Sequence, residues 1–129
     1  MIGLDTNVLV RYLTQDDAGQ AAKVARVIDS AEPGSLFVSG VVLCELIWVL
    51  EDVYRHGRGE IADVVDKLLQ TAQFAFEDKD LLWQALADFR HGKGDFADHV
   101  IGRVAHRAGC EHTLTFDRGL KNQRLFQLL

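Results

Sequence analysis

The stretch Ile2-Gly3-Leu4-Asp5-Thr6-Asn7 decides how the chain begins to fold. Its apolar start predicts a short strand, and its polar end is a typical helix cap, so a helix is predicted over residues 8–13. The same order recurs where residues 36–38 predict a strand and Ser39 caps a helix predicted over residues 40–56. A strand followed directly by a helix is typical of α/β domains.

The rest of the chain repeats this alternation. Apolar residues at helical spacing predict helices that end near residues 31, 72, 89 and 108. Asp16 and Asp17 can cap the first of these helices, Ile61 begins the apolar pattern of the second, Asp78 can cap the third, and Ala97 begins the apolar pattern of the fourth. Short apolar runs predict strands at residues 74–76, 113–116 and 125–129. Short strands separated by one or two helices imply βαβ crossovers. We therefore expect a mostly parallel sheet with helices on both faces.

Length and composition exclude several classes of protein. The 129 residues have the size of one domain, so a single domain over residues 1–129 is expected. With 48% hydrophobic residues, 26% charged residues and one proline, the chain is neither disordered nor collagen-like. No apolar run approaches the roughly 20 residues that cross a bilayer, so no membrane association is expected.

The cysteines and the N-terminus indicate a cytoplasmic protein. Cys44 and Cys110 have no close-spaced partner, which argues against a disulfide scaffold or a zinc site. The first residues lack the basic segment and apolar core of a secretory signal. A reducing cytoplasm is the expected location.

Charge is distributed unevenly along the chain. The net charge is -5, but residues 1–89 hold 7 basic and 15 acidic residues, whereas residues 90–129 hold 7 basic and 4 acidic residues. An acidic protein is a poor non-specific binder of nucleic acid, yet a local basic surface can still hold a polyanion.

Acidic residues fall where an α/β fold concentrates function. Asp5 and Asp117 each end a predicted strand, and ligands bind at the carboxyl edge of parallel sheets. Glu45 follows the second strand on a helix, and its apolar neighbours predict a semi-buried position near the same edge. Asp95 and Asp98 begin the last long helix and project from one side of its first turn. We expect these acids to converge at one end of the sheet.

Converging carboxylates repel one another and need a compensating cation. An all-oxygen set of ligands without a cluster of cysteines or histidines favours Mg²⁺ or Mn²⁺ over Zn²⁺. Such an ion accepts phosphate oxygens as further ligands, so phosphodiester or phosphoryl chemistry is expected.

Four motifs carry a resemblance to a known family. Leu4-Asp5-Thr6-Asn7, Val42-Leu43-Cys44-Glu45-Leu46, residues 95–101 and Leu114-Thr115-Phe116-Asp117 resemble the acidic motifs of PIN-domain ribonucleases. Their order and spacing are similar to those of VapC-type toxins of toxin–antitoxin pairs. The resemblance implies a three-layer α/β/α sandwich, Mg²⁺- or Mn²⁺-dependent cleavage of RNA, inhibition by a cognate antitoxin and a homodimer.

The resemblance also assigns roles to residues. It implies that Asp5, Glu45, Asp98 and Asp117 are the catalytic, metal-binding acids, and that Thr115 is the hydroxyl residue before the last acid. Asp95 is an extra ligand or, as we favour, a helix cap. Thr6 and Asn7 either support Asp5 and the substrate or cap the helix.

Basic residues give candidate contacts to RNA phosphates. Arg11, Arg118, Lys121 and Arg124 lie near the ends of the motifs. A basic stripe on the last long helix (His99, Arg103, His106 and Arg107) either engages RNA or, as we favour, is a solvated helix face. Trp48 and Tyr54 are contacts to an antitoxin or a second copy, or else packing residues.

Two other functions remain open from the sequence. A Mg²⁺-dependent phosphatase or phosphoacceptor shares the chemistry, although no second acid lies two residues after Asp5. A non-catalytic module that binds a metal or a protein partner would use the acids without cleaving anything.

Overall fold

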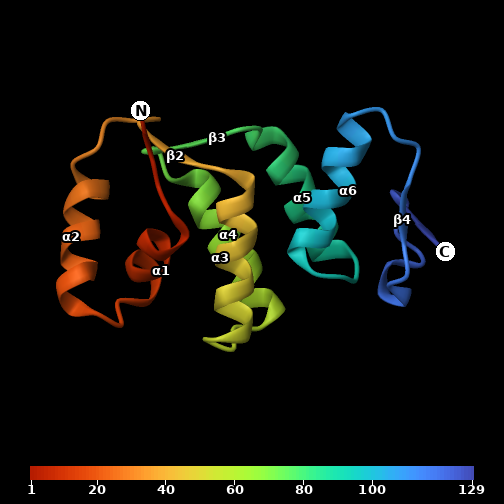
Figure 1. Ribbon diagram of the computed structural model, residues 1–129, viewed down its shortest axis with the longest axis horizontal. Coiled ribbons are helices and arrows are strands. Elements are labelled where there is room, and N and C mark those ends of the chain that lie inside the picture. The colour runs from red at the N-terminus through yellow and green to blue at the C-terminus, as the bar shows by residue number, and fades with distance from the viewer. The chain divides into compact units, whose positions relative to one another are not determined.

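The computed structural model describes residues 1–129, which form two compact units, residues 1–77 and residues 78–129. Figure 1 shows the order of their helices and strands. Each unit has its own parallel strands and its own buried side chains. The single domain expected over residues 1–129 stays a prediction.

The first unit contains a three-stranded parallel sheet with the order β1-β2-β3. Its strands are β1 (Ile2–Gly3), β2 (Leu36–Val38) and β3 (Phe74–Phe76), and its helices are α1 (Thr6–Thr14), α2 (Ala18–Asp29), α3 (Gly40–Asp52) and α4 (Arg58–Gln70). Leu36 of the central strand is in register with Ile2 on one side and Phe74 on the other.

The second unit combines two helices with a pair of parallel strands. It contains α5 (Lys79–His91), α6 (Phe96–Arg107), β4 (Thr113–Thr115), the 3₁₀ helix η1 (Arg118–Leu120) and β5 (Phe126–Leu128). Strand β4 pairs with β5 in parallel. Every strand pair in the chain is therefore parallel, which confirms the predicted α/β class.

Polar caps start the helices where the sequence predicted them. Asp17 accepts a hydrogen bond from the Gln20 N–H at 3.0 Å, and Ser39 accepts one from the Val42 N–H at 3.1 Å. Each cap satisfies a backbone donor that has no partner within its helix.

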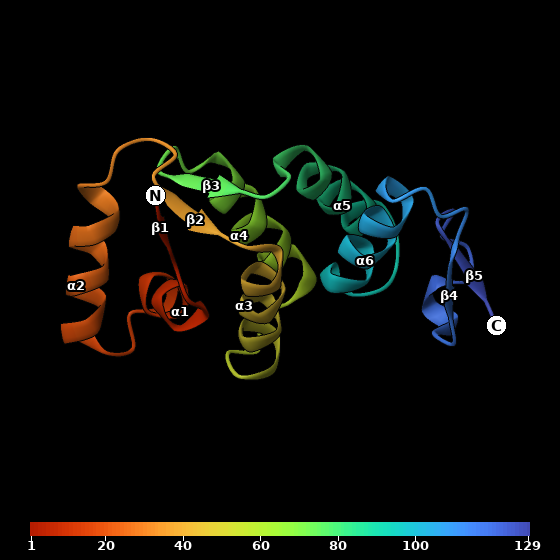
Figure 2. The ribbon, with the colours of Figure 1, turned by 45° about the horizontal axis from the view of Figure 1, so that its top comes forward.

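Buried aliphatic side chains hold the helices of the first unit together. Helix α1 packs against α2 and α3, and α3 packs against α4; Figure 2 shows α1 and α3 side by side beneath the strands. Leu9, Leu43, Leu50 and Ile61 are completely buried. No helix in either unit has the length and apolar character that crossing a bilayer requires.

Helix α3 ends earlier than predicted. The periodicity predicted a helix to residue 56, but α3 ends at Asp52. Arg55 adopts a left-handed conformation with φ of 59°, and the His56 N–H donates to the Leu50 carbonyl at 3.0 Å. This turn closes the helix and satisfies a carbonyl of its last turn.

Helix α6 buries a different face from the one predicted. Residues 97–108 carry an apolar stripe that was predicted to face inward, yet Ile101 and Val104 are each 53% exposed. The buried residues are Phe96, His99, Val100 and Gly102. Arg103, which pairs with Asp88 of α5, lies one turn after His99 on the same side of α6 as the buried residues.

The first prediction concerns the core of α3. Leu50→Ala, at a site with no exposed surface, should lower the free energy of unfolding by about 2–5 kcal/mol. Val41→Ala on the same helix, where the side chain is 78% exposed, should change it by less than about 0.5 kcal/mol. Urea denaturation measures both values, and equal losses would contradict the assigned buried face.

Candidate functional site

Asp5 directly follows β1 and caps α1. Its Oδ1 accepts a hydrogen bond from the Thr6 N–H at 2.8 Å, and Thr6 itself is buried. The second carboxylate oxygen of Asp5 makes no hydrogen bond, and the residue is exposed. Backbone contact therefore fixes the carboxylate and leaves one oxygen available to a ligand.

Glu45 lies in the second turn of α3 and is exposed, so the predicted semi-buried position is wrong. Its apolar neighbours in sequence lie on another face: Leu43, Leu46 and Leu50 point into the core, whereas Glu45 shares the outer face with Trp48. The Glu45 carboxylate has no hydrogen-bond partner.

Asp95 and Asp98 lie together in the first turn of α6. Asp95 occupies the position before the helix, and its N–H donates to Oδ2 of Asp98 at 2.9 Å. Asp98 thus satisfies a backbone donor with one oxygen and keeps the other free. The structure confirms the prediction that Asp95 occupies the cap position of this helix.

Asp117 follows β4 and opens the turn into η1. Its Oδ1 accepts from the Gly119 N–H at 2.8 Å, and its own N–H donates to Oγ1 of Thr115 at 3.0 Å. Thr115, predicted as a supporting residue, therefore fixes the backbone of Asp117. The carboxylate of Asp117 is exposed.

Three of the four predicted acids share one arrangement. Asp5, Asp98 and Asp117 each bind a backbone N–H with one carboxylate oxygen and leave the other oxygen unbonded. Hydrogen bonds of this kind orient metal-binding carboxylates in proteins. The donor set consists of hard oxygen atoms, which fits Mg²⁺ or Mn²⁺.

The structure brings together only part of the predicted set. Asp98 lies with Asp95, and η1, which follows Asp117, packs against the loop before α6 through Leu120 and Gly94. In neither unit do three histidine, cysteine, aspartate or glutamate side chains gather around a possible metal position. Asp5 and Glu45 belong to the first unit.

The loop before α6 is tightly constrained. Gly94 has φ of 95°, and a β-carbon there would fall 2.5 Å from a methyl group of Leu120. His99 is 2% exposed, and its Nε2 lies 2.7 Å from the Lys93 carbonyl oxygen. A carbonyl only accepts, so Nε2 carries the proton.

His99 is a buried supporting residue, a role that the sequence analysis missed when it placed His99 in the basic stripe. Its ring also lies edge-on to Phe89, at 6.3 Å between centroids. The available signal was a histidine placed one turn into a helix that follows Gly92-Lys93-Gly94. His99 ties this loop to the helix that carries Asp98.

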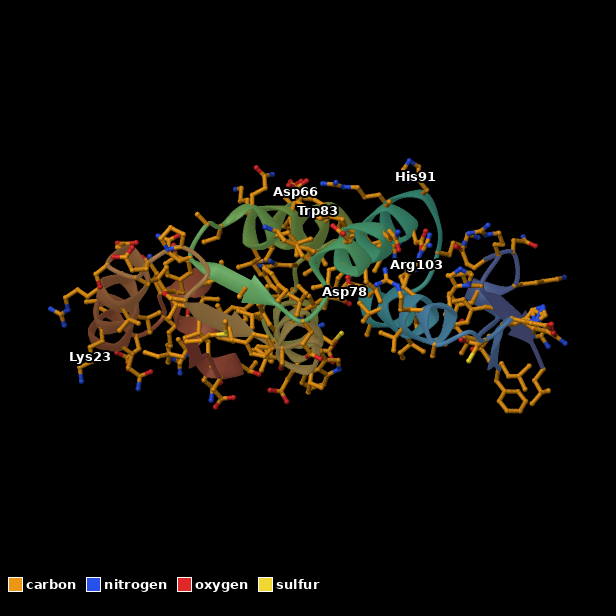
Figure 3. All side chains as sticks on the ribbon, turned by 90° about the horizontal axis from the view of Figure 1, so that it is seen from above. Lys23, Asp66, Asp78, Trp83, His91 and Arg103 are labelled. Carbon is orange, nitrogen blue, oxygen red and sulfur yellow. The ribbon has the colours of Figure 1, made fainter.

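In the basic stripe on α6, His99 is buried and Arg103 and Arg107 pair with α5 and its cap, so the favoured solvated face is wrong for these three residues, while contact with RNA stays a prediction. Arg103 makes two hydrogen bonds to Asp88, at 2.6 and 2.8 Å, and Arg107 pairs with Asp78. The hydrogen bonds that Arg103 donates to the Asp88 carboxylate raise the pKa of Arg103 above its usual value. Figure 3 labels Arg103 and Asp78 among the side chains of this unit.

Other basic candidates remain unpaired. Arg118 is the first residue of η1 and Lys121 follows η1; both are exposed, and neither makes an ion pair. Arg124 lines a small pocket of the second unit with His99 and Arg103. Arg11 donates from Nε to the Gln20 side chain at 2.7 Å, and its other guanidinium nitrogens are free.

Trp48 and Tyr54, the two aromatic candidates for partner contacts, lie in different environments. Trp48 is exposed on the outer face of α3. The Tyr54 hydroxyl donates to the carboxylate of Asp16, which ties the end of α3 to the loop between α1 and α2. Tyr54 therefore serves packing, and only Trp48 keeps its aromatic surface exposed.

The two thiols differ in environment. Cys44 is half-buried on α3 beside Glu45, and burial raises the pKa of its thiol. Cys110 is exposed after α6. No disulfide forms between them.

Comparison with known proteins shows which family model and which solved structure the chain matches. A family model for the PIN domain matches residues 2–124. A solved structure that is similar to the chain is described as the crystal structure of Mycobacterium tuberculosis VapC20, a sarcin–ricin loop cleaving toxin. It has 22% identity and a TM-score of 0.46, and the match covers 90% of this chain and 88% of that one. No curated protein sequence matches.

The second prediction concerns His99. His99→Leu should lower the free energy of unfolding by about 1 kcal/mol more than His99→Gln, because Gln keeps an N–H for the Lys93 carbonyl. The Leu variant should also speed amide exchange at Asp95. Urea denaturation and hydrogen exchange test this, and identical behaviour of both variants would contradict the role of the hydrogen bond.

The third prediction concerns the thiols. Iodoacetamide reacts with the thiolate, so the raised pKa of Cys44 should leave it mostly unreactive at pH 8, with a rate that keeps rising at higher pH. Exposed Cys110 should be labelled first. Mass spectrometry follows each site, and labelling in urea, where both sites should react alike, is the control.

Proposed function

Because the chain belongs to the PIN-domain family, we propose that it is a metal-dependent endoribonuclease that acts as the toxin of a VapC-type toxin–antitoxin pair. The observation that carries the proposal is the family match over residues 2–124, which spans all four acidic motifs. The toxin role rests on the resemblance of these motifs to those of VapC-type toxins.

Asp5, Glu45, Asp98 and Asp117 are assigned to hold Mg²⁺ or Mn²⁺. The free oxygens of Asp5, Asp98 and Asp117, each on a carboxylate held by a backbone N–H, support this assignment. When bound, such an ion lowers the pKa of a water molecule and provides a nucleophile for a phosphodiester. Asp95 acts through Asp98, which its N–H orients.

The chain's own residues supply the remaining functions. Thr115 fixes the backbone of Asp117, and Thr6 fixes the carboxylate of Asp5. Arg11, Arg118 and Lys121 are the contacts to RNA phosphates, since each has guanidinium or ammonium donors that no carboxylate neutralises. Asn7 is exposed and supplies an amide to the substrate.

The partners follow from the same resemblance. The substrate is RNA, and a cognate antitoxin inhibits the enzyme. Exposed Trp48, on the outer face of α3 with Glu45, is a contact either to the antitoxin or to the second copy of a homodimer.

The fourth prediction tests the chemistry. The purified chain, freed of any copurifying partner, is incubated with structured and unstructured RNA in Mg²⁺, Mn²⁺ or EDTA. Cleavage should require the metal. Asp5→Asn and Asp98→Asn should each lower the cleavage rate by more than the roughly 10–100-fold that removal of an outer-shell partner costs. Gel analysis of end-labelled RNA gives the rates.

Asp52→Asn is the matched control, because Asp52 is exposed on α3 outside all four motifs. It should cleave at the parent rate, and circular dichroism should show all variants folded. Undiminished cleavage by Asp5→Asn or Asp98→Asn would overturn the assigned site. Turnover of a phosphomonoester with no cleavage of RNA would indicate a phosphatase instead.

A further inference from the structure

We propose that the groove between α1 and α2 binds a single-stranded segment of the RNA next to Asp5, and that Lys23 contacts its phosphate. This inference rests on the proposed function and extends it to a substrate-binding site. No motif of the chain includes Lys23 or any other residue of α2.

The groove is a defined feature of the first unit. It has a volume of about 280 Å³, close to the lower end of the roughly 300–1,000 Å³ typical of ligand sites. Helices α1 and α2 pack against each other, and both contribute residues to its lining. The residues that line it are Asn7, Val8, Arg11, Gln20, Lys23 and Val24.

The surface of the groove is mainly apolar, and the two charged residues that line it, Arg11 and Lys23, are both cations. Arg11 donates one hydrogen bond, from Nε to the Gln20 side chain, and its other guanidinium nitrogens are free. Lys23 is exposed and forms no ion pair, so both cations can bind phosphate. Figure 3 shows Lys23 projecting outward from α2. No acidic residue lines the groove, although residues 1–77 hold 12 acidic and 6 basic residues. The charged residues that line the groove are therefore cationic only, although the Asp5 carboxylate lies two residues before Asn7.

The groove begins beside the candidate metal ligand. Asn7 is two residues after Asp5 on the same helix, and Arg11 lies one turn further on, about 6 Å along the axis. A strand whose phosphate lies at Asp5 can therefore continue along α1 into the groove. Val8 and Val24 offer an apolar surface to a base, and the Asn7 amide can pair with a base edge.

A duplex fits this site poorly. An A-form helix presents stiff, closely spaced phosphates, whereas the groove offers two cations with apolar and amide groups between them. Single-stranded RNA with exposed bases uses all of these groups. The expected ligand is thus an unpaired segment, such as a loop.

The fifth prediction tests the groove. Lys23→Gln should weaken binding of a fluorescent single-stranded oligoribonucleotide by about 3- to 10-fold in EDTA, where no cleavage occurs. The slope of log affinity against log salt should fall by about 0.7, the value for one phosphate contact on a single strand. In Mg²⁺ the same variant should raise KM and leave kcat near the parent value.

Two control variants separate a local contact from general charge. Arg26→Gln removes a cation from α2 outside the groove, and Lys67→Gln makes the same change on α4. Both should bind RNA as the parent does. If Arg26→Gln weakens binding as much as Lys23→Gln, bulk charge accounts for the effect and the groove proposal is overturned.

The remaining outcomes distinguish the two proposals. Parent-like RNA affinity and salt slope for Lys23→Gln, alongside normal cleavage, overturn the groove but not the ribonuclease, and they would fit a groove that binds a protein partner. If Lys23→Gln selectively loses RNA binding but the parent chain cleaves no RNA, the groove proposal is supported and the ribonuclease proposal is contradicted. A parent chain that binds no RNA overturns both.

Discussion

The parallel pairing of β2 with both of its neighbours is the constraint on which the first unit depends. Leu36 is in register with Ile2 and with Phe74, so three short strands end at one edge. The chain then turns directly into helices at Asp5 and Ser39, whose side chains cap α1 and α3. Pairing of the strands thereby fixes where Asp5 lies and where the helix that carries Glu45 begins.

Capping and metal binding are compatible uses of the same carboxylates. A helix cap needs one oxygen, and Asp5, Asp98 and Asp117 each give one oxygen to the backbone and keep the other. The hydrogen bond restricts rotation of the carboxylate, which lowers the entropy cost of binding an ion. The capping pattern is therefore a reason to expect these acids to be preorganised.

Local signals in the sequence were enough to predict most helix starts and the strands. Asp17, Ser39 and Asp78 cap helices as expected, because a capping side chain acts on donors only two or three residues away. The predicted family was confirmed by the family model, because its motifs combine residue type with order along the whole chain. The site residues themselves stay predictions.

The errors arose where distant or conformational effects decide the structure. Helix α3 ends in a left-handed Arg55, which apolar periodicity does not encode. The face that α6 buries includes His99, whose ring packs against Phe89 of another helix, and apolar periodicity does not mark a histidine as buried. Glu45 was placed inward from its neighbours in sequence, although residues adjacent in a helix point in different directions.

Pairing within the second unit also decides which cations remain for RNA. Residues 90–129 hold seven basic residues, but Arg103 and Arg107 are neutralised by Asp88 and Asp78. Arg118, Lys121 and Arg124 form no ion pair. In a chain of net charge -5, the proposed attraction of RNA would depend on such unpaired cations and not on total charge. The α5–α6 ion pairs therefore remove Arg103 and Arg107 from the free basic surface of the unit, and Arg118, Lys121 and Arg124 remain around η1 and the segment that follows it.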